Sequence, residues 1–161
     1  MLHAYYDCSK KEKFQTLFGD LWVGKHPTPL QGRYQVLHLD FSYVGGSIDK
    51  VEENFDMYLR VKLDGFMRIY QEFYLTDFKE KFFKTDSATE KLALLQDETA
   101  TKSIPLYLII DEYDNFTNTV LNEQGENVYW AITYADGFYR DVFKKFKGMF
   151  ERIFITGVGS R

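Results

Sequence analysis

The sequence predicts a three-layer α/β/α sandwich around a mostly parallel sheet, in a single domain covering residues 1–161. Three nearly continuous apolar runs, at residues 35–42, 105–112 and 152–157, indicate strands. Stretches with a helical spacing of apolar residues separate them. Strands of a parallel sheet are buried on both faces, so they lack the usual alternation of polar and apolar residues. With 161 residues, 45% of them hydrophobic, the chain can bury one sizeable core.

The N-terminal part is expected to be a helix over residues 1–21, followed by a loop. The apolar residues at mostly helical spacing are Leu2, Tyr5 or Tyr6, Phe14, Leu17, Phe18 and Leu21. Residues 26–34 hold two of the three prolines and Gly32, which predicts a loop. The first strand follows at 35–42 and ends before the glycine pair at 45–46.

A long amphipathic helix is predicted over residues 48–73. Ser47 is a suitable N-cap, and Asp49 lies in the first turn, where the helix dipole favours an anion. The apolar residues that recur at intervals of three and four are Ile48, Val51, Phe55, Leu59, Leu63, Phe66, Tyr70 and Phe73. Gly65 should weaken this helix without breaking it.

Further helices are expected on both sides of the second strand. A helical stretch covers residues 76–83, and Ser87 with Glu90 forms a capping box for the next helix. Another helix is predicted over 128–150, where Gly137 could divide it, and it leads into the third strand.

Charge and cysteine content exclude several classes of protein. The formal net charge of -4 argues against nucleic acid as the main partner, and the lysine runs at 10–13 and 144–147 are expected to be solvated helix faces. Cys8 is the only cysteine and cannot form an internal disulfide. No apolar run approaches the roughly 20 residues needed to cross a bilayer, and no basic leader precedes an apolar stretch. We therefore expect a cytoplasmic protein without a membrane partner.

A cluster of carboxylates follows the second strand, in PLYLIIDEYDNF at residues 105–116. In parallel α/β proteins ligands bind beyond the carboxyl ends of the strands, so polar residues at the three strand ends should gather at one edge. The residues expected there are Asp40, Ser42, Asp111, Glu112 and Thr156.

Adjacent carboxylates at a strand end suit a hydrated magnesium ion, which takes one or two carboxylates and keeps several waters. Asp111 would hold a metal-bound water, and Glu112 could orient or deprotonate an attacking water. Alternatively, the acidic residues from Asp111 to Asp114 simply open the segment after the strand.

Two other side-chain groups have structural as well as functional interpretations. His38 and Asp40 share one face of the first strand and could bind a metal, but no third ligand is visible, which favours a hydrogen-bonded core histidine. The many aromatic residues could form a base-stacking platform or partner surface, although their helical spacing favours a core role.

The motif LYLIIDEYD resembles the Walker B strand of P-loop ATPases, and its context is similar to the AAA-ATPase-like family of bacteria. Leu39-Asp40 matches the end of a preceding strand in that family, and residues 154–158 match a later one. The resemblance implies that Asp111 directs magnesium, that Glu112 is the catalytic base, and that Thr156 takes the place of a γ-phosphate-sensing residue (sensor 1). Asp114 matches the last carboxylate of the motif, with no chemistry assigned.

The glycine-rich phosphate loop of that family, ending in Gly-Lys-Ser or Gly-Lys-Thr, does not occur in these 161 residues. We therefore expect a fragment of a larger P-loop NTPase-like domain, lacking the first and last strands of the order 5-1-4-3-2. The resemblance implies that the retained strands are contiguous, with 105–112 between 35–42 and 152–157. The parent would bind and hydrolyse Mg²⁺-ATP, whereas the fragment should hold no nucleotide and be inactive. The resemblance gives no role to Arg161.

Removal of the first strand would leave the strand before Thr156 with an open edge, which predicts self-association or coverage by a terminal segment. Two functional hypotheses remain: a segment of an ATPase, or a non-catalytic α/β interaction module with an acidic, cation-binding edge. A magnesium-dependent nuclease is less favoured, because no lysine accompanies the carboxylates on an adjoining strand.

Overall fold

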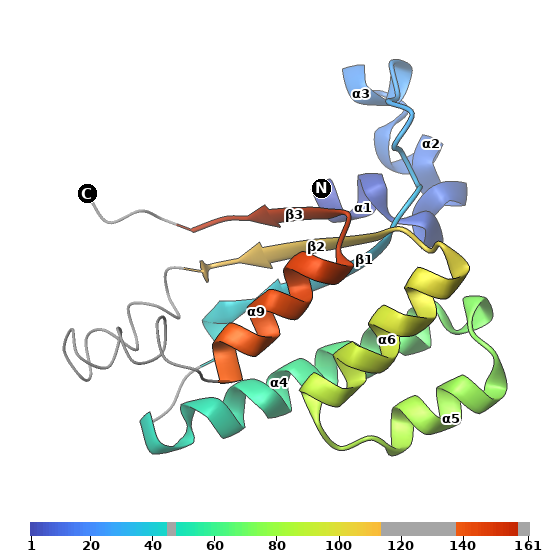
Figure 1. Ribbon diagram of the computed structural model, residues 1–161. Coiled ribbons are helices and arrows are strands. Elements are labelled where there is room, and N and C mark those ends of the chain that lie inside the picture. Colours follow the sequence, from blue (N-terminus) through green and yellow to red (C-terminus); the bar gives the residue numbers. More distant parts are fainter. Residues whose placement is uncertain (45–47, 114–137, 158–161) are drawn as a thin grey trace.

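The computed structural model describes residues 1–44, 48–113 and 138–157 (Figure 1). The helices are α1 (Leu2–Tyr6), α2 (Phe14–Phe18), α3 (Trp22–Lys25), α4 (Ile48–Ile69), α5 (Thr76–Lys84), α6 (Ala88–Lys102) and α9 (Phe138–Met149). The 3₁₀ turns are η1 (Cys8–Lys13), η2 (Phe41–Tyr43) and η3 (Gln71–Phe73). The strands are β1 (Gln35–Asp40), β2 (Leu106–Asp111) and β3 (Arg152–Ile155).

The three strands form one parallel sheet in the order β1-β2-β3. The central position of β2 confirms the prediction that the strand before the carboxylates lies between the other two. In the register of the sheet, Asp40 of β1 is the partner of Asp111 of β2, and Ile155 of β3 is the partner of Ile110. The three carboxyl ends therefore meet at one edge.

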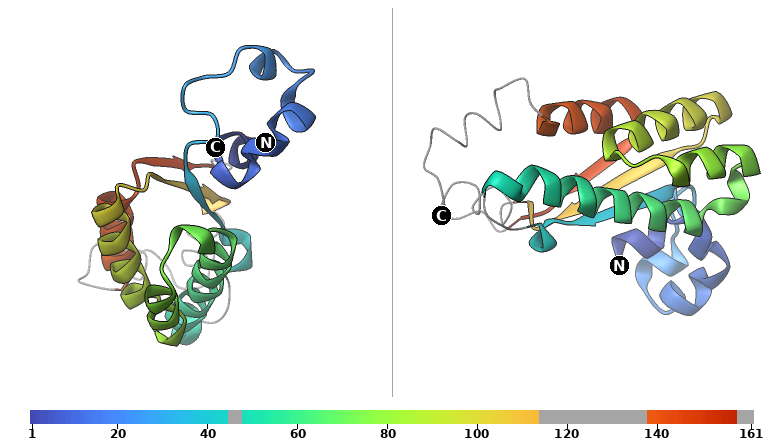
Figure 2. Two further views of the ribbon diagram at one scale, coloured as in Figure 1. Left: turned by 90° about the vertical axis from the view of Figure 1, so that its right-hand side faces the viewer. Right: turned by 90° about the horizontal axis from the view of Figure 1, so that it is seen from below.

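A thick helical layer covers one face of the sheet. Helices α4, α6 and α9 lie on this face in Figures 1 and 2, as connections of the same hand require when successive strands are added in one direction. Leu37, Leu39, Leu108 and Ile110 of the sheet are at most 2% exposed and belong to the same core cluster as the inner faces of these helices. This layer holds the largest apolar cluster, so most of the burial that stabilises the described fold lies here.

The opposite face is covered by the N-terminal segment alone among the described residues. Val36, Tyr107 and Ile109 are buried beneath Leu2 and Tyr6 of α1. Strand β3 differs, since Ile153, Phe154 and Ile155 are 39%, 43% and 50% exposed. The α/β class and the parallel sheet are confirmed, but the expectation that all three strands are buried on both faces is wrong for β3.

The predicted helix over residues 1–21 is divided into α1, η1 and α2, because Asp7 leaves the helical conformation (φ −71°, ψ 119°). The Asp7 backbone forms a parallel bridge with Tyr34. Its carboxylate, in a residue 1% exposed, accepts hydrogen bonds from the Ser9 amide and the Tyr70 hydroxyl, both 2.8 Å long. A buried carboxylate with these partners is better satisfied than it would be within a continuous helix.

The later helices follow the predictions closely. Helix α4 continues through Gly65 and ends at Ile69, after which η3 takes the last predicted turn. The Ser87 hydroxyl accepts a 3.4 Å bond from the Glu90 amide, as the capping box requires, and Ser103 ends α6 in a left-handed conformation. Ser47 and the predicted helical part before Phe138 lie outside the described residues. None of the helices within the described ranges is long and apolar enough to cross a membrane.

Candidate functional site

Asp111 is the last residue of the central strand and contacts the ends of both neighbouring strands. Its Oδ2 accepts a 2.6 Å hydrogen bond from Nε2 of His38 in β1. Its Oδ1 accepts a hydrogen bond from the hydroxyl of Thr156, immediately after β3. We call His38, Asp111 and Thr156 the strand-end cluster.

The two hydrogen bonds favour the charged form of Asp111. The Thr156 hydroxyl and, after it, His38 hold the pKa of this carboxyl below its ordinary value, against the opposing effect of partial burial. An ionised carboxylate can only accept hydrogen bonds, so Nε2 of His38 carries the hydrogen. The Asp111 side chain is 40% exposed, which leaves it accessible to water or a hydrated ion.

Asp40 lies opposite Asp111 in the sheet register, but its carboxylate is used locally. Its Oδ1 accepts hydrogen bonds from the Ser42 amide (3.0 Å) and the Ser42 hydroxyl (2.6 Å), which caps η2. Its backbone amide donates to the Tyr58 hydroxyl at 2.7 Å. Asp40 thus lies near Asp111 at the predicted edge. The two carboxylates carry like charges, so no hydrogen bond between them is expected.

Glu112 follows directly and is exposed, with a left-handed backbone at φ 56°. Its neighbours are tied to the third strand: the Tyr113 amide donates to the Thr156 carbonyl at 3.0 Å, and the Thr156 amide donates to the Ile110 carbonyl at 2.8 Å. A non-glycine residue with positive φ costs about 1 kcal/mol or more, so these bonds on either side hold Glu112 in a strained position.

The sequence favours His38 as a hydrogen-bonded core histidine over a metal ligand shared with Asp40, and the structure gives it a different environment. It bonds to Asp111 and its side chain is 42% exposed. The ring of His3, in α1, stacks beside it at a centroid distance of 5.9 Å. Sequence reasoning gave His3 no role, because nothing in the local pattern links the first helix to the end of the first strand.

No group of three or more histidine, cysteine, aspartate or glutamate residues is close enough to hold a metal within residues 1–44, 48–113 and 138–157. Asp111 and Asp40 would therefore supply one or two carboxylates at most, the number that a hydrated magnesium ion takes. Asp114 and Arg161 lie outside the described residues.

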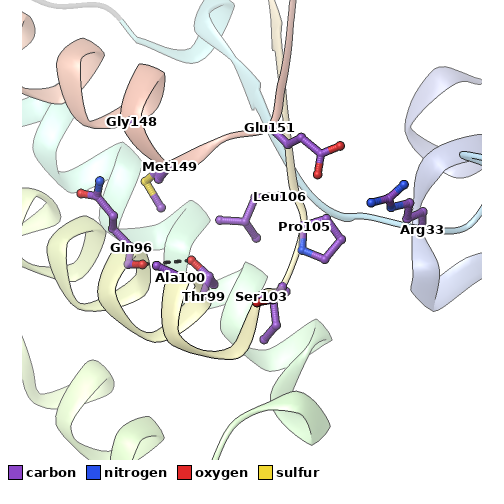
Figure 3. A pocket seen from close by; sticks show the side chains of 11 residues that line it. Arg33, Gln96, Thr99, Ala100, Ser103, Pro105, Leu106, Gly148, Met149 and Glu151 are labelled. Carbon is purple, nitrogen blue, oxygen red and sulfur yellow. Dashed lines mark hydrogen bonds between the residues drawn. The ribbon is translucent and has the colours of Figure 1, made fainter.

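A separate cavity of about 480 Å³ lies at the other end of the sheet (Figure 3). It is bordered by Arg33, by Pro105 and Leu106 at the start of β2, and by Glu151 before β3. Thr99 of α6 also lines it, but its hydroxyl is already bonded to the Leu95 carbonyl at 2.7 Å. This cavity shares no residue with the strand-end cluster.

Parallel strands joined through helices make this an α/β protein, and a carboxylate and a hydroxyl lie at the carboxyl ends of its described strands. The chain belongs to the AAA-ATPase-like family, described as predicted AAA-ATPase, which matches residues 1–160. No match was found among curated proteins or among solved structures.

Proposed function

We propose that the chain is the part of an ATP-hydrolysing module that carries the Walker B strand (β2) and the sensor-1-like strand (β3). The observation that carries this proposal is the strand-end cluster, in which Asp111 bonds to residues of both neighbouring strands in a member of the AAA-ATPase-like family. ATP with Mg²⁺ is the proposed ligand of the intact protein.

The residues present fit a magnesium ion bound through water. The pKa of Asp111 is lowered, which favours its ionised form, and its side chain is 40% exposed. Both of its oxygens accept hydrogen bonds from protein groups, and a water molecule bound to the ion could donate to them in the same way. When bound, the ion would neutralise phosphate charge. Asp40 is a further candidate ligand, although its bonds to Ser42 would have to rearrange, and Asp114 is proposed from sequence alone.

Glu112 is the proposed general base. Its side chain is exposed beside Asp111, and its strained backbone is held between two hydrogen bonds to the third strand. Strain of this kind occurs where a side chain must keep one position. Thr156 is proposed to sense the γ-phosphate. Its hydroxyl now donates to Asp111, and it would have to give up that bond in order to donate to a phosphate oxygen, so the presence of the phosphate would change the contacts of Asp111.

The phosphate-binding half of such a site needs backbone amides and a lysine, and no glycine-rich loop ending in Gly-Lys-Ser or Gly-Lys-Thr occurs in residues 1–161. We therefore propose that this chain alone has little turnover and that a longer protein supplies the loop.

Steady-state Mg²⁺-ATP turnover and nucleotide binding in a longer protein that carries such a loop would test the assignment. Glu112→Gln should lower kcat about 10²- to 10⁴-fold while nucleotide still binds. Glu80→Gln is a matched control, since Glu80 is exposed on α5. Unchanged turnover in the Glu112 variant would refute its role as the base.

The alternative is a non-catalytic interaction module whose acidic edge binds cations. The observation that favours it is that Asp111 already joins three strands through His38 and Thr156, as a purely structural carboxylate would. In that case Asp111→Asn would reduce stability, and no upstream phosphate loop would restore turnover.

The open edge of β3 supports a second proposal about partners. Within the described ranges β3 pairs only with β2, and its apolar residues are 39–50% exposed. We propose that this edge accepts a strand from a second copy of the chain. Ile153→Pro would block such pairing, because proline removes a backbone donor.

A further inference from the structure

His38 is the one exposed side chain of β1. Gln35, Val36, Leu37 and Leu39 of the same strand are buried, whereas the His38 side chain is 42% exposed. Successive residues of a strand point to opposite faces, so His38 lies on the same face as Val36, which α1 covers. Burial alone therefore gives no reason for an imidazole at this position.

Asp111 lies on the same face of the neighbouring strand. Ile109 shares a cluster with Val36, so Asp111, two residues after Ile109, points to that face as well. In the register of the sheet His38 is the partner of Ile109, and its Nε2 donates forward to Oδ2 of Asp111 at 2.6 Å. The bond thus runs diagonally from β1 to the end of β2.

The two donors to Asp111 come from opposite sides of the central strand. Oδ2 accepts from His38 in β1, and Oδ1 accepts from Thr156 after β3. The last torsion of an aspartate side chain is broad, so the carboxylate turns easily unless its oxygens are held. An ionised carboxylate offers about four lone-pair sites, and two bonds leave about two of them, in fixed directions, for other donors.

The proposed sensing role of Thr156 makes the second donor necessary. If the Thr156 hydroxyl turned toward a phosphate oxygen, Oδ1 of Asp111 would lose its donor. The bond from His38 would then be the remaining printed tie between the described side chains and this carboxylate. The ring of His38 is itself supported by the ring of His3, at a centroid distance of 5.9 Å and an interplanar angle of 25°.

We infer that His38 is a positioning residue of the proposed magnesium site. Its Nε2–H keeps the Asp111 carboxylate in the orientation that accepts from the water of a hydrated ion, including while Thr156 donates elsewhere. This inference rests on the proposed function. Removing a partner that orients a metal-site ligand lowers metal affinity about 10- to 100-fold. Since Asp111 would act through water, we expect the lower end of that range, about tenfold.

Two substitutions at His38 separate the donor from the ring. His38→Phe keeps a ring that can stack on His3 and removes the donor. His38→Gln removes the ring and keeps an amide N–H at about the reach of Nε2. A structural role through stacking predicts that the phenylalanine variant is the milder one, and a positioning role predicts the opposite. His26→Phe is the matched control, because His26 is exposed and stacks on Trp22 of α3 at 4.8 Å, away from the site.

NMR couplings to the Asp111 Hβ protons measure the side-chain rotamer in the 161-residue chain without metal. Thr156→Val imitates a threonine that has turned away, and in it Asp111 should keep one χ1 rotamer. Adding His38→Phe should give averaged couplings, whereas adding His38→Gln should not. Urea unfolding of each variant shows that it is folded. Averaged couplings in Thr156→Val alone, or a single rotamer after His38→Phe is added, would overturn the inference.

The magnesium dependence of turnover, in a longer protein with a phosphate loop, tests the consequence for the site. His38→Phe should raise the Mg²⁺ concentration for half-maximal turnover about tenfold, with kcat at saturating Mg²⁺ changed less than about twofold, and His38→Gln should restore it. Normal turnover with an unchanged Mg²⁺ dependence in His38→Phe would refute the role of His38 alone. No turnover in the unsubstituted longer protein would refute the proposed function, and the magnesium role of His38 with it.

Discussion

The hydroxyl of Thr156 should be the main reason that Asp111 is ionised at low pH. Thr156→Val keeps the branched shape of the side chain and removes the hydrogen bond to Oδ1 of Asp111. That bond is the largest cause of the lowered Asp111 pKa, with the His38 bond second. We expect the pKa of Asp111 in Thr156→Val to rise toward the ordinary value of about 3.9.

The size of the effect follows from the exposure of the pair. A hydrogen bond to a charged group contributes about 1.5–3 kcal/mol when well shielded. Asp111 is 40% exposed, so water can replace the lost hydroxyl, and we reduce the expected loss of unfolding free energy at pH 7 to about 1 kcal/mol.

The pH dependence has a definite sign. The pKa of Asp111 is lower in the folded chain than in the unfolded one, so its stabilising contribution is present above the unfolded pKa and is lost as pH falls through the folded pKa. The difference between the native chain and Thr156→Val should therefore be largest near neutral pH and shrink in acid.

Urea unfolding at pH 7 and at about pH 3, together with carbon NMR titration of the Asp111 carboxyl, would measure both quantities. Thr101→Val is a matched control, because Thr101 is exposed near the end of α6, where its hydroxyl donates to the Asp97 carbonyl at 2.8 Å. An Asp111 pKa that does not move in Thr156→Val would show that the described hydrogen bond does not control this carboxylate.

Three further substitutions test buried hydrogen bonds and the backbone strain at Glu112. Lys91→Met should lower the free energy of unfolding by about 2 kcal/mol, measured by urea titration. Lys91 is 2% exposed, and its ammonium donates to Asp64 (2.8 Å) and to the Phe82 carbonyl (2.7 Å). An unchanged free energy would mean that these bonds contribute little. Tyr70→Phe should cost about 2–3 kcal/mol by calorimetry, since the hydroxyl accepts from a strand amide and donates to Asp7, both at 2.8 Å. Glu112→Gly should raise stability by up to about 1 kcal/mol, by relieving a positive φ, whereas Glu112→Ala should not; equal effects would argue against strain.

The sheet was predictable because its signals are local and strong. Runs such as LYLIID contain no charged residue before Asp111, which favours a strand, and the order of the strands followed from the family resemblance. The exposure of β3 could not be inferred from its sequence, since RIFI is as apolar as the buried strands. Within the described residues β1 also pairs with one strand only, yet it is buried because α1 and α4 contact it; coverage by helices is a property of the tertiary packing and not of the strand sequence.

The N-terminal helix was predicted too long because helical periodicity extends across Asp7. The competing interactions come from residues far away in the chain: Tyr34 pairs with the Asp7 backbone, and Tyr70 donates to its carboxylate. Such tertiary bonds override a local pattern and leave no trace in it.

At the candidate site, the proximity of Asp111 and Thr156 was predictable, because it depends only on the order of parallel strands. The partnership of His38 with Asp111, rather than with Asp40 on its own strand, depends on side-chain reach between neighbouring strands. The positive φ of Glu112 likewise arises from hydrogen bonds made by the residues around it.

The buried carboxylate of Asp7 limits how far the chain can be shortened from its N-terminus. A version that started at Ser9 would leave the Tyr70 hydroxyl without its acceptor and uncover Tyr107 and Ile109, which lie beneath Leu2 and Tyr6. The first eight residues therefore cover the face of the sheet opposite α4, α6 and α9. Trimming them to obtain a smaller domain would produce a less soluble one.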